Sequence, residues 1–502
     1  MKISKKLVWV LMIATVTAFS SCSDSGNDEV ETTNEPKLLS FGFYAEDNQG
    51  ILSKDYVVSA IPADNKLTIP LPAFLDRTHL VARFTMNDKN IVLLDGVTQV
   101  SGASPNDFSV PLDYIVSNGK SNVKYSVTVT KATNMVWTRM ADFADKTVYS
   151  GARLVISPTE EIPYLAFKIK DAEASKSKMS LAKLVNGTWA IVGSTDGFSE
   201  GEVGSSNYSV DFDSKGYPYV AYSDQTATVK GAASMMKWDG TSWNYVGEKG
   251  FVQAQSTKIE LAVVEENKPI VAQINTSRVV SFARNELVMS QYSGIWNNAG
   301  LPLLASATPI YLCKMAKSGA DAYLSVIYRG TVDGVNYGYS VYKYSNGTWT
   351  SLLTNYLEAG ATQTSIVTLN MAATDEAVYV LTSDDALITG SYRPRLRKYN
   401  ATDKTWSTVG GEPINMIINS HTSTGLAIAP DGTPFVVYRN EQDYPAVVYL
   451  DSETQQWSSP KVIADVACDD LNMQFTSTGI GYVSFLDANN HVVTFKYDVA
   501  TE

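Results

Sequence analysis

Short apolar and aromatic segments, each bounded by glycine, asparagine or aspartate, recur along most of the 502-residue chain. In several of them apolar and polar side chains alternate, as in His79–Thr85 and Val123–Thr130. A period of two is typical of a strand with one buried face, and β-branched and aromatic residues favour that conformation. The pattern therefore predicts an all-β protein.

A repeat marked by tryptophan runs through residues 133–502. Successive tryptophans are 52, 54, 53, 53, 57 and 51 residues apart, at Trp137, Trp189, Trp243, Trp296, Trp349, Trp406 and Trp457. A steady period of about 50 residues is that of a propeller blade, which is a sheet of four antiparallel strands. The seven tryptophans therefore predict a seven-bladed β-propeller.

The interior of each repeat supports this prediction. Asn346-Gly347 comes just before Trp349, and such a pair adopts the positive φ of a two-residue hairpin, so the tryptophan opens the outermost strand. The last repeat ends after three strand segments, at 471–476, 481–486 and 492–497. We expect the strand around Trp137 to complete that blade, which closes the ring and leaves no open sheet edge.

The N-terminal segment has the features of an export signal. Three lysines precede the apolar stretch Leu7–Phe19, and Cys22 follows two serines. This arrangement resembles a bacterial lipobox, although Phe19 departs from the usual aliphatic residue. The resemblance implies a lipoprotein signal peptide over 1–21, lipidation of Cys22 and a polar flexible tether over 22–35. No later apolar stretch reaches the length of about 18 residues that a spanning helix needs, so we expect attachment to the membrane through lipid alone.

Residues 36–132 predict a separate small β-sandwich. The unit resembles the immunoglobulin-like modules of Gram-negative surface lipoproteins, notably at Ser101-Gly102, at Asn106–Ser109 and in the closing Tyr-x-Val-x-Val pattern from Tyr125. Such modules are mostly spacers. The resemblance implies a lipid-anchored protein of the outer membrane or cell surface and assigns no chemistry to the unit.

The repeat array is similar to the kelch-like and galactose-oxidase-like propellers, although the kelch glycine doublet occurs once, at Gly410-Gly411. Copper oxidases of that group need two tyrosines, a modified cysteine and two histidines, and Cys313 and Cys468 have no matching context. The turn Ser345–Trp349 is similar to a sialidase Asp-box but lacks its aspartate and its spacing. The sequence therefore predicts no metal and no cofactor, and we expect Cys313 and Cys468 to be buried free thiols.

The chain has a formal net charge of −12, which disfavours nucleic acid as a partner because phosphates are repelled. In each repeat the residue just after the second strand is expected at the mouth of the propeller. The candidate ligand-binding residues chosen there, together with two histidines expected on the same face, are Asp224, Arg329, Asp384, Arg439, Asp487, His421 and His491. Such a mixture of charges suits a hydroxyl-rich or zwitterionic ligand, although these positions are also ordinary for solvated loop tips.

Three classes of function fit this sequence. The first, which we favour, is a surface-anchored protein that binds glycans or other polar ligands at the propeller mouth. The second is a carbohydrate-active enzyme, a hydrolase or a lyase, that uses carboxylates at the same mouth. The third is a scaffold that binds a surface protein by one face of the propeller. No catalytic residue can be assigned from the sequence.

Overall fold

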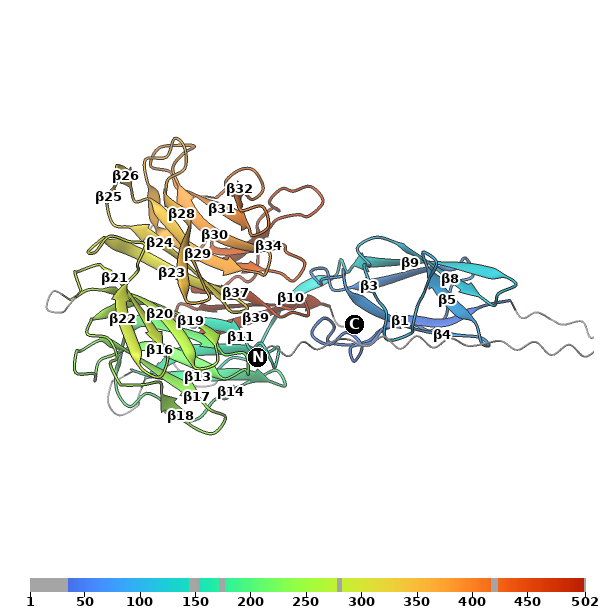
Figure 1. Cartoon of the computed structure of the whole chain (residues 1–502), viewed down its shortest axis with the longest axis horizontal. Coiled ribbons are helices and arrows are strands. Elements are labelled where there is room, and N and C mark those ends of the chain that lie inside the picture. Colours follow the sequence, from blue (N-terminus) through green and yellow to red (C-terminus); the bar gives the residue numbers. More distant parts are fainter. Residues whose placement is uncertain are drawn as a thin grey trace, which may run out of the picture.

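The computed structural model describes residues 35–143, 151, 153–170, 177–277, 282–416 and 423–500, and every regular element within these ranges is a β-strand. Two bodies lie side by side, a small unit of two sheets and a larger body of many sheets (Figure 1). The predicted all-β class with a β-propeller is confirmed. Cys22 and His421 lie outside the described residues.

The small unit packs a four-stranded sheet against a five-stranded sheet. The first has the order β2 (Tyr56–Val58), β1 (Leu38–Phe43), β4 (Leu80–Met86) and β7 (Pro105–Asn106). The second has the order β3 (Lys66–Leu71), β9 (Asn122–Lys131), β8 (Leu112–Ser117), β5 (Ile91–Leu94) and β6 (Val97–Thr98), with β3 parallel to β9. Alternate residues of β3 and β4 are buried, and Phe41, Phe43 and Phe108 lie in the core between the sheets.

Seven four-stranded sheets, which we call blades 1 to 7, make up the larger body as far as the structure describes it. Blades 1 to 3, from inner to outer strand, are β11 (Arg153–Ile156), β12 (Pro163–Lys170), β13 (Ser177–Val185) and β14 (Thr188–Ile191); β15 (Val203–Phe212), β16 (Pro218–Asp224), β17 (Ala232–Trp238) and β18 (Trp243–Tyr245); and β19 (Ser256–Glu265), β20 (Lys268–Asn275), β21 (Leu287–Tyr292) and β22 (Trp296–Gly300).

Blades 4 to 6 follow the same order. They are β23 (Ile310–Ser318), β24 (Asp321–Tyr328), β27 (Tyr339–Ser345) and β28 (Thr348–Tyr356); β29 (Thr364–Ala373), β30 (Ala377–Asp384), β31 (Arg393–Asn400) and β32 (Thr405–Thr408); and β33 (Thr424–Ile428), β34 (Pro434–Arg439), β35 (Pro445–Tyr449) and β36 (Lys461–Val462). The loop after β24 carries an extra hairpin, β25 (Thr331–Val332) and β26 (Val335–Asn336).

Blade 7 combines strands from both ends of the described chain. Its order is β37 (Asp469–Phe475), β38 (Gly481–Leu486), β39 (Val492–Val499) and β10 (Met135–Arg139). β10 pairs antiparallel with β39, and Trp137 is opposite Tyr497. The inner strands of successive blades contact one another, and β37 also contacts β11 of blade 1.

Three of the seven repeated tryptophans connect neighbouring blades through a hydrogen bond. The indole Nε1 of Trp243 donates a hydrogen bond to the Val192 carbonyl of the preceding blade at 2.9 Å, and Trp296 and Trp406 make the same bond to Val246 at 2.7 Å and to Leu352 at 2.9 Å. Each bond satisfies a partly buried donor and fixes one blade against the next. The tryptophan period seen in the sequence therefore reflects in part a contact between blades, although Nε1 of Trp137, Trp349 and Trp457 is buried without a hydrogen-bond partner among the described residues.

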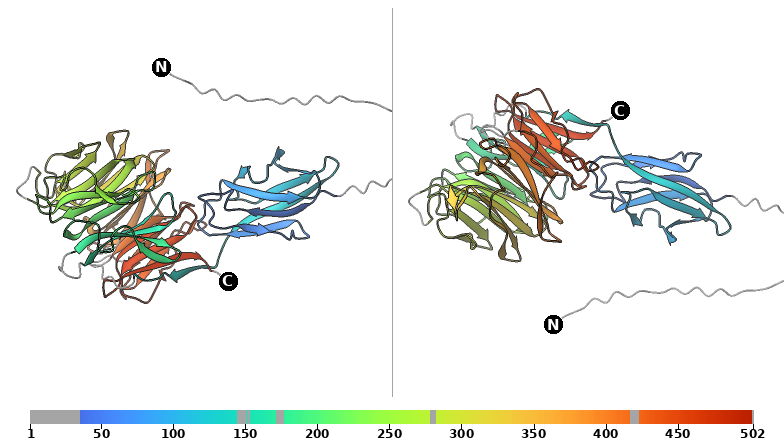
Figure 2. Two further views of the ribbon diagram at one scale, coloured as in Figure 1. Left: turned by 90° about the horizontal axis from the view of Figure 1, so that it is seen from below. Right: turned by 90° about the horizontal axis from the view of Figure 1, so that it is seen from above.

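The small unit is joined to the propeller by an inserted phenylalanine. Phe74, in the loop after β3, packs among rings of blades 6 and 7, with ring centroids 4.8 Å from Phe435 and 5.9 Å from Tyr497. The backbone N–H of Asp431 donates to the Phe74 carbonyl at 3.2 Å, and Lys131 forms an ion pair with the Asp431 carboxylate at 3.4 Å. The views of Figure 2 show the small unit beside the red strands of blade 7.

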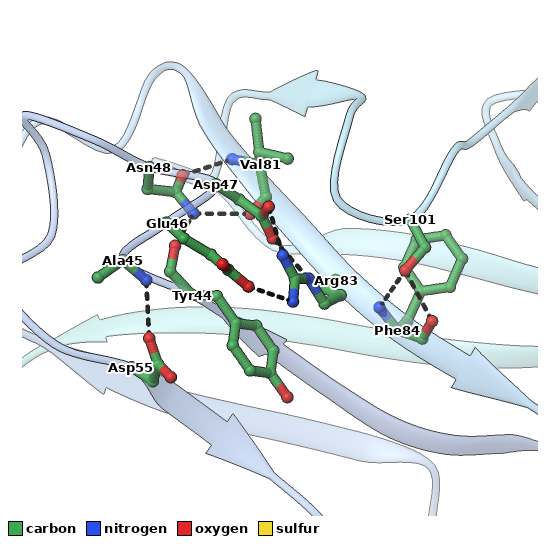
Figure 3. A network of polar contacts seen from close by, with 10 residues as sticks. All are labelled: Tyr44, Ala45, Glu46, Asp47, Asn48, Asp55, Val81, Arg83, Phe84 and Ser101. Carbon is green, nitrogen blue, oxygen red and sulfur yellow. Dashed lines mark hydrogen bonds and ion pairs between the residues drawn. The ribbon is translucent and has the colours of Figure 1, made fainter.

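A polar network braces the loop between β1 and β2 of the small unit (Figure 3). The guanidinium of Arg83 donates two hydrogen bonds to Asp47, at 2.7 and 2.6 Å, and forms an ion pair with Glu46 at 2.6 Å. The buried amide of Asn48 bonds the backbone of Val81 from both of its ends. Fork-shaped pairing of this kind fixes geometry more than it adds stability at an exposed site.

Candidate functional site

A polar cavity of about 610 Å³, which we call the axial cavity, is surrounded by the inner strands of all seven blades. It lies where those strands begin. A second cavity of about 480 Å³ lies at the other end of the inner strands, and Arg153 and Glu260 line both. These two side chains therefore lie between the two cavities.

Irregular pairing of the inner strands shapes the wall of the axial cavity. Among the described residues, five inner strands shift register against their neighbours at this end, between Val203 and Tyr208, Thr257 and Glu260, Ile310 and Leu312, Thr364 and Leu369, and Asp469 and Asn472. A bulge turns a side chain away from the direction that strict alternation would give it. Polar residues thereby reach the axis from strands that are otherwise apolar.

One polar contact in the wall joins blade 1 to blade 7. The Arg153 guanidinium donates to an Asp470 oxygen at 2.9 Å and lies over the Tyr208 ring at 5.8 Å. A Cβ atom at Gly151 would lie 1.3 Å from the Asp470 carboxylate, so a larger residue there would displace this side chain. Asp470 raises the pKa of Arg153, and burial raises the pKa of the Tyr208 hydroxyl, so the guanidinium is charged and the phenol neutral at pH 7.

Further groups extend this polar lining around the axis. The Lys314 ammonium forms an ion pair with Glu260 at 2.7 Å, and Asn370 donates to the Thr424 hydroxyl of the next blade at 2.9 Å. The charged residues that line the cavity in the described part of the chain are three bases and three acids, Arg153, Lys258, Lys314, Glu260, Asp469 and Asp470. The wall is thus polar and carries no net charge.

The structure places two of the candidate residues from the sequence inside the blades. Asp224 is 2% exposed and accepts hydrogen bonds from Thr226 at 2.8 and 2.6 Å and from Ser234 at 2.9 Å. Asp384 is 5% exposed and accepts from Arg395 at 2.8 Å. A buried charge needs hydrogen-bond partners, and both carboxylates find some of theirs in the loop that follows their strand.

The other candidates lie at the corresponding ends of blades 4, 6 and 7, nearer the solvent. Arg329 is exposed and lies over the Tyr311 ring at 5.6 Å, and Arg439 pairs with Asp443 at 2.6 Å. Asp487 lies 3.5 Å from the ring of His491, which is more than half exposed. None of these six described candidates lines the axial cavity, so the structure does not bring them together there. Their binding of a ligand stays a prediction.

The residues of the cavity wall, in contrast, were not selected from the sequence. The candidates were chosen at the ends of the second strand of each blade, which is one strand away from the axis. The wall of the cavity is built by the innermost strands. A signal was present in Lys258-Ile259-Glu260, where charged residues interrupt an inner strand, and in the adjacent acids Asp469-Asp470. The bulges that direct these side chains toward the axis cannot be recognised from the alternation of hydrophobic and polar residues.

No group of three or more His, Cys, Asp or Glu residues in the described ranges has the arrangement of a metal site. Cys313 and Cys468 are buried free thiols, as expected from the sequence. Within the described ranges, no helix has the length and apolar character needed to cross a membrane.

Fold and site together define a β-propeller with a polar axial cavity. Neither a family model nor a curated protein matches the chain. Among solved structures, it is similar to an ulvan lyase of polysaccharide lyase family PL25 (12% identity, TM-score 0.43), over 73% of this chain and 96% of that one. It is also similar to a fungal alcohol oxidase of the AA5 family in complex with copper (12% identity, TM-score 0.46, 73% and 76% covered) and to the Aleuria aurantia lectin (12% identity, TM-score 0.38, 58% and 91% covered). At such identities the likeness concerns the fold alone.

Proposed function

We propose that this protein binds a neutral glycan in the axial cavity. The observation that carries the proposal is the composition of the wall: three bases and three acids, several held in pairs, with amide side chains between them. A volume of about 610 Å³ is within the range of small-ligand sites. Sugar hydroxyls both donate and accept, so they complement guanidinium, ammonium, carboxylate and amide groups alike.

The pairing of charges argues for a neutral ligand. Arg153 is held by Asp470 at 2.9 Å and Lys314 by Glu260 at 2.7 Å, so neither cation is free to form an ion pair with an acidic sugar without losing its own partner. Breaking such a partly buried pair leaves a charge unpaired, which is costly. A neutral hydroxyl-rich ligand instead bonds to the remaining lone pairs and N–H groups of an intact pair.

A glycan array probed with the full chain, followed by calorimetry with the sugars that bind, tests this proposal. Arg153→Gln and Asp470→Asn each remove a charge from the wall and should weaken binding at least about 10-fold, which is the effect of one lost charge-assisted hydrogen bond. The matched control is Arg139→Gln on β10. It breaks an exposed ion pair with Asp142 and should bind normally.

Three outcomes would change the proposal. Equal binding by Arg153→Gln and the original chain would remove the axial cavity as the site. Substitutions at Arg329, Arg439 or Asp487 that weaken binding more than those at Arg153 would move the site to the outer loops. Release of sugar products would replace binding by catalysis, and capture of a protein partner without any glycan would favour the scaffold alternative.

We also propose that the chain is anchored to the outer membrane or cell surface through lipid on Cys22. The support is the lysine-rich and apolar segment before this cysteine. The described chain begins at the end of the small unit away from the propeller (Figure 2), which fits an anchor at that side. Metabolic labelling with a fatty acid should mark the original chain and leave Cys22→Ser unmarked. Equal labelling of both would overturn the anchor.

A further inference from the structure

Three arginines lie in a row on β31, the third strand of blade 5. Arg393, Arg395 and Arg397 are separated by two residues each, so their side chains share one face of the strand. That face is turned toward blade 4, because the Arg397 guanidinium lies over the Tyr356 ring of β28 at 4.1 Å. β28 and β31 are labelled next to each other in Figure 1. We call this row and its surroundings the arginine seam.

Two carboxylates face these three guanidinium groups. Asp384 accepts from Arg395 Nε at 2.8 Å, and a Glu358 oxygen lies 3.5 Å from Arg395 Nε and 3.6 Å from Arg397 Nη1. Arg393 has no carboxylate within 4 Å among the described residues, and its Nη1 donates to the amide oxygen of Asn415 at 2.6 Å. The seam therefore holds one positive charge more than it has acidic partners.

The hydrogen-bond donors of the seam are also in excess. Arg393 Nε, Arg397 Nε and Arg397 Nη1 are buried and have no acceptor among the described residues, and 3.6 Å is too long for a hydrogen bond from Arg397 to Glu358. Buried guanidinium N–H groups without acceptors are rare and call for an explanation such as a bound ion. Asn415 is exposed and Arg393 half-buried, so a small ligand can reach Arg393 from the solvent.

We propose that the arginine seam binds an oxyanion, a carboxylate or phosphate group, with Arg393 as its principal partner. A guanidinium presents two parallel N–H groups that match two oxygens of a carboxylate or phosphate. A bound oxyanion supplies both the missing acceptor for Arg393 and the missing negative charge. Water supplies an acceptor but leaves the charge uncompensated. The site is separate from the axial cavity, since none of these residues lines that cavity.

Titration calorimetry of the full chain at constant ionic strength tests the proposal, with sodium phosphate and sodium acetate as probes and chloride as the background salt. We expect saturable binding of at least one probe and a concentration-dependent rise in melting temperature, because a ligand that binds the folded state stabilises it. Preference between phosphate and acetate distinguishes the two oxyanion classes. Arg393→Gln should weaken binding at least about 10-fold, while Arg393→Lys, which keeps the charge but loses the fork, should retain part of it.

Two controls separate binding from general effects. Arg139→Gln removes an exposed arginine on β10 and should leave the affinity unchanged. Arg153→Gln alters the axial cavity and should also leave the affinity for the oxyanion unchanged. The oxyanion proposal can therefore hold even if the glycan proposal fails. No saturable binding of either probe, or equal binding by Arg393→Gln, would show that water satisfies the seam and would overturn the proposal.

Discussion

Trp137 stacks on Tyr497 across the pair formed by β10 and β39, with ring centroids 4.6 Å apart and ring planes inclined by 24°. The two residues come from opposite ends of the propeller sequence. β10 is the outermost strand of blade 7, and no other described strand pairs with its far side. The first strand of the propeller sequence, β10, thus completes the sheet formed by its last three strands, β37, β38 and β39.

Removal of this strand should destabilise the propeller. Trp137→Ala is expected to lower the free energy of unfolding by about 2–4 kcal/mol, because a half-buried aromatic ring and its stacking contact with Tyr497 are lost. A chain that starts at about residue 145 should lose more than one that starts at 133, because the edge of β39 is then unpaired. Denaturant titration measures both changes.

Val136→Ala is the matched control for Trp137. Val136 is on the same strand, is 39% exposed and should change stability by less than about 1 kcal/mol. If Trp137→Ala proved as mild as Val136→Ala, β10 would not be the element that holds blade 7 together.

Phe74 should couple the small unit to the propeller. Its ring has neighbours at 4.8 to 6.2 Å on blades 6 and 7, so Phe74→Ala is expected to remove about 2–4 kcal/mol from the interface. Calorimetry should then resolve two melting transitions that separate further than in the original chain. Phe74→Leu retains most of the apolar contact and should behave nearly normally. Identical traces for the alanine and leucine variants would count against a role for this ring in coupling.

Much of the fold could be predicted because its determinants are local and repeated. The tryptophan period, the Asn-Gly turns and the apolar second strands each recur in sequence. At Asn346-Gly347 the structure has φ values of 49° and 83°, as a two-residue hairpin with positive φ requires. The contact made by Phe74 could not be predicted, because an apolar residue in a loop of the small unit reads as part of that unit's own core.

The site was harder to predict than the fold. Asp224 and Asp384 were chosen because charges at equivalent strand ends suggest a ligand, yet each is enclosed by partners within its own blade. The charges on the axial wall depend on bulges in the inner strands and on pairs between residues far apart in the chain, such as Arg153 and Asp470. Neither feature follows from composition or period.

The two described cysteines should be unreactive while the chain is folded. Burial raises the pKa of the Cys468 thiol to about 12 and raises the pKa of Cys313 as well, so neither forms a thiolate near pH 8. A thiol reagent such as Ellman's reagent should modify them only after denaturation. Mass spectrometry should assign each modified site, which keeps any reaction of Cys22 distinct. Rapid modification of Cys468 in the native chain would contradict its burial.

Asp385 should give the folded state a dependence on acid. Burial alone would raise the pKa of this carboxylate, but hydrogen bonds from Thr362 at 2.7 and 2.6 Å and from Gly390 at 3.0 Å outweigh burial and lower it. A lowered pKa in the folded state means that the unfolded chain binds the proton first as the pH falls. The stabilisation is therefore complete above about pH 5 and is lost progressively as the pH falls below about 4.

Asp385→Asn isolates this contribution. At pH 7 the variant should be less stable by about 1–2 kcal/mol, since the asparagine keeps one acceptor oxygen and places an N–H₂ group against donors. Near pH 3 the difference should shrink, because a proton then binds Asp385 more readily in the unfolded chain than in the folded one, which removes part of the stabilisation of the original chain. Denaturant titrations between pH 3 and 7 measure the convergence, with Asp196→Asn at an exposed carboxylate as the control. A stability gap that stays constant from pH 7 to pH 3 would mean that the proton does not compete with the bonds from Thr362 and Gly390.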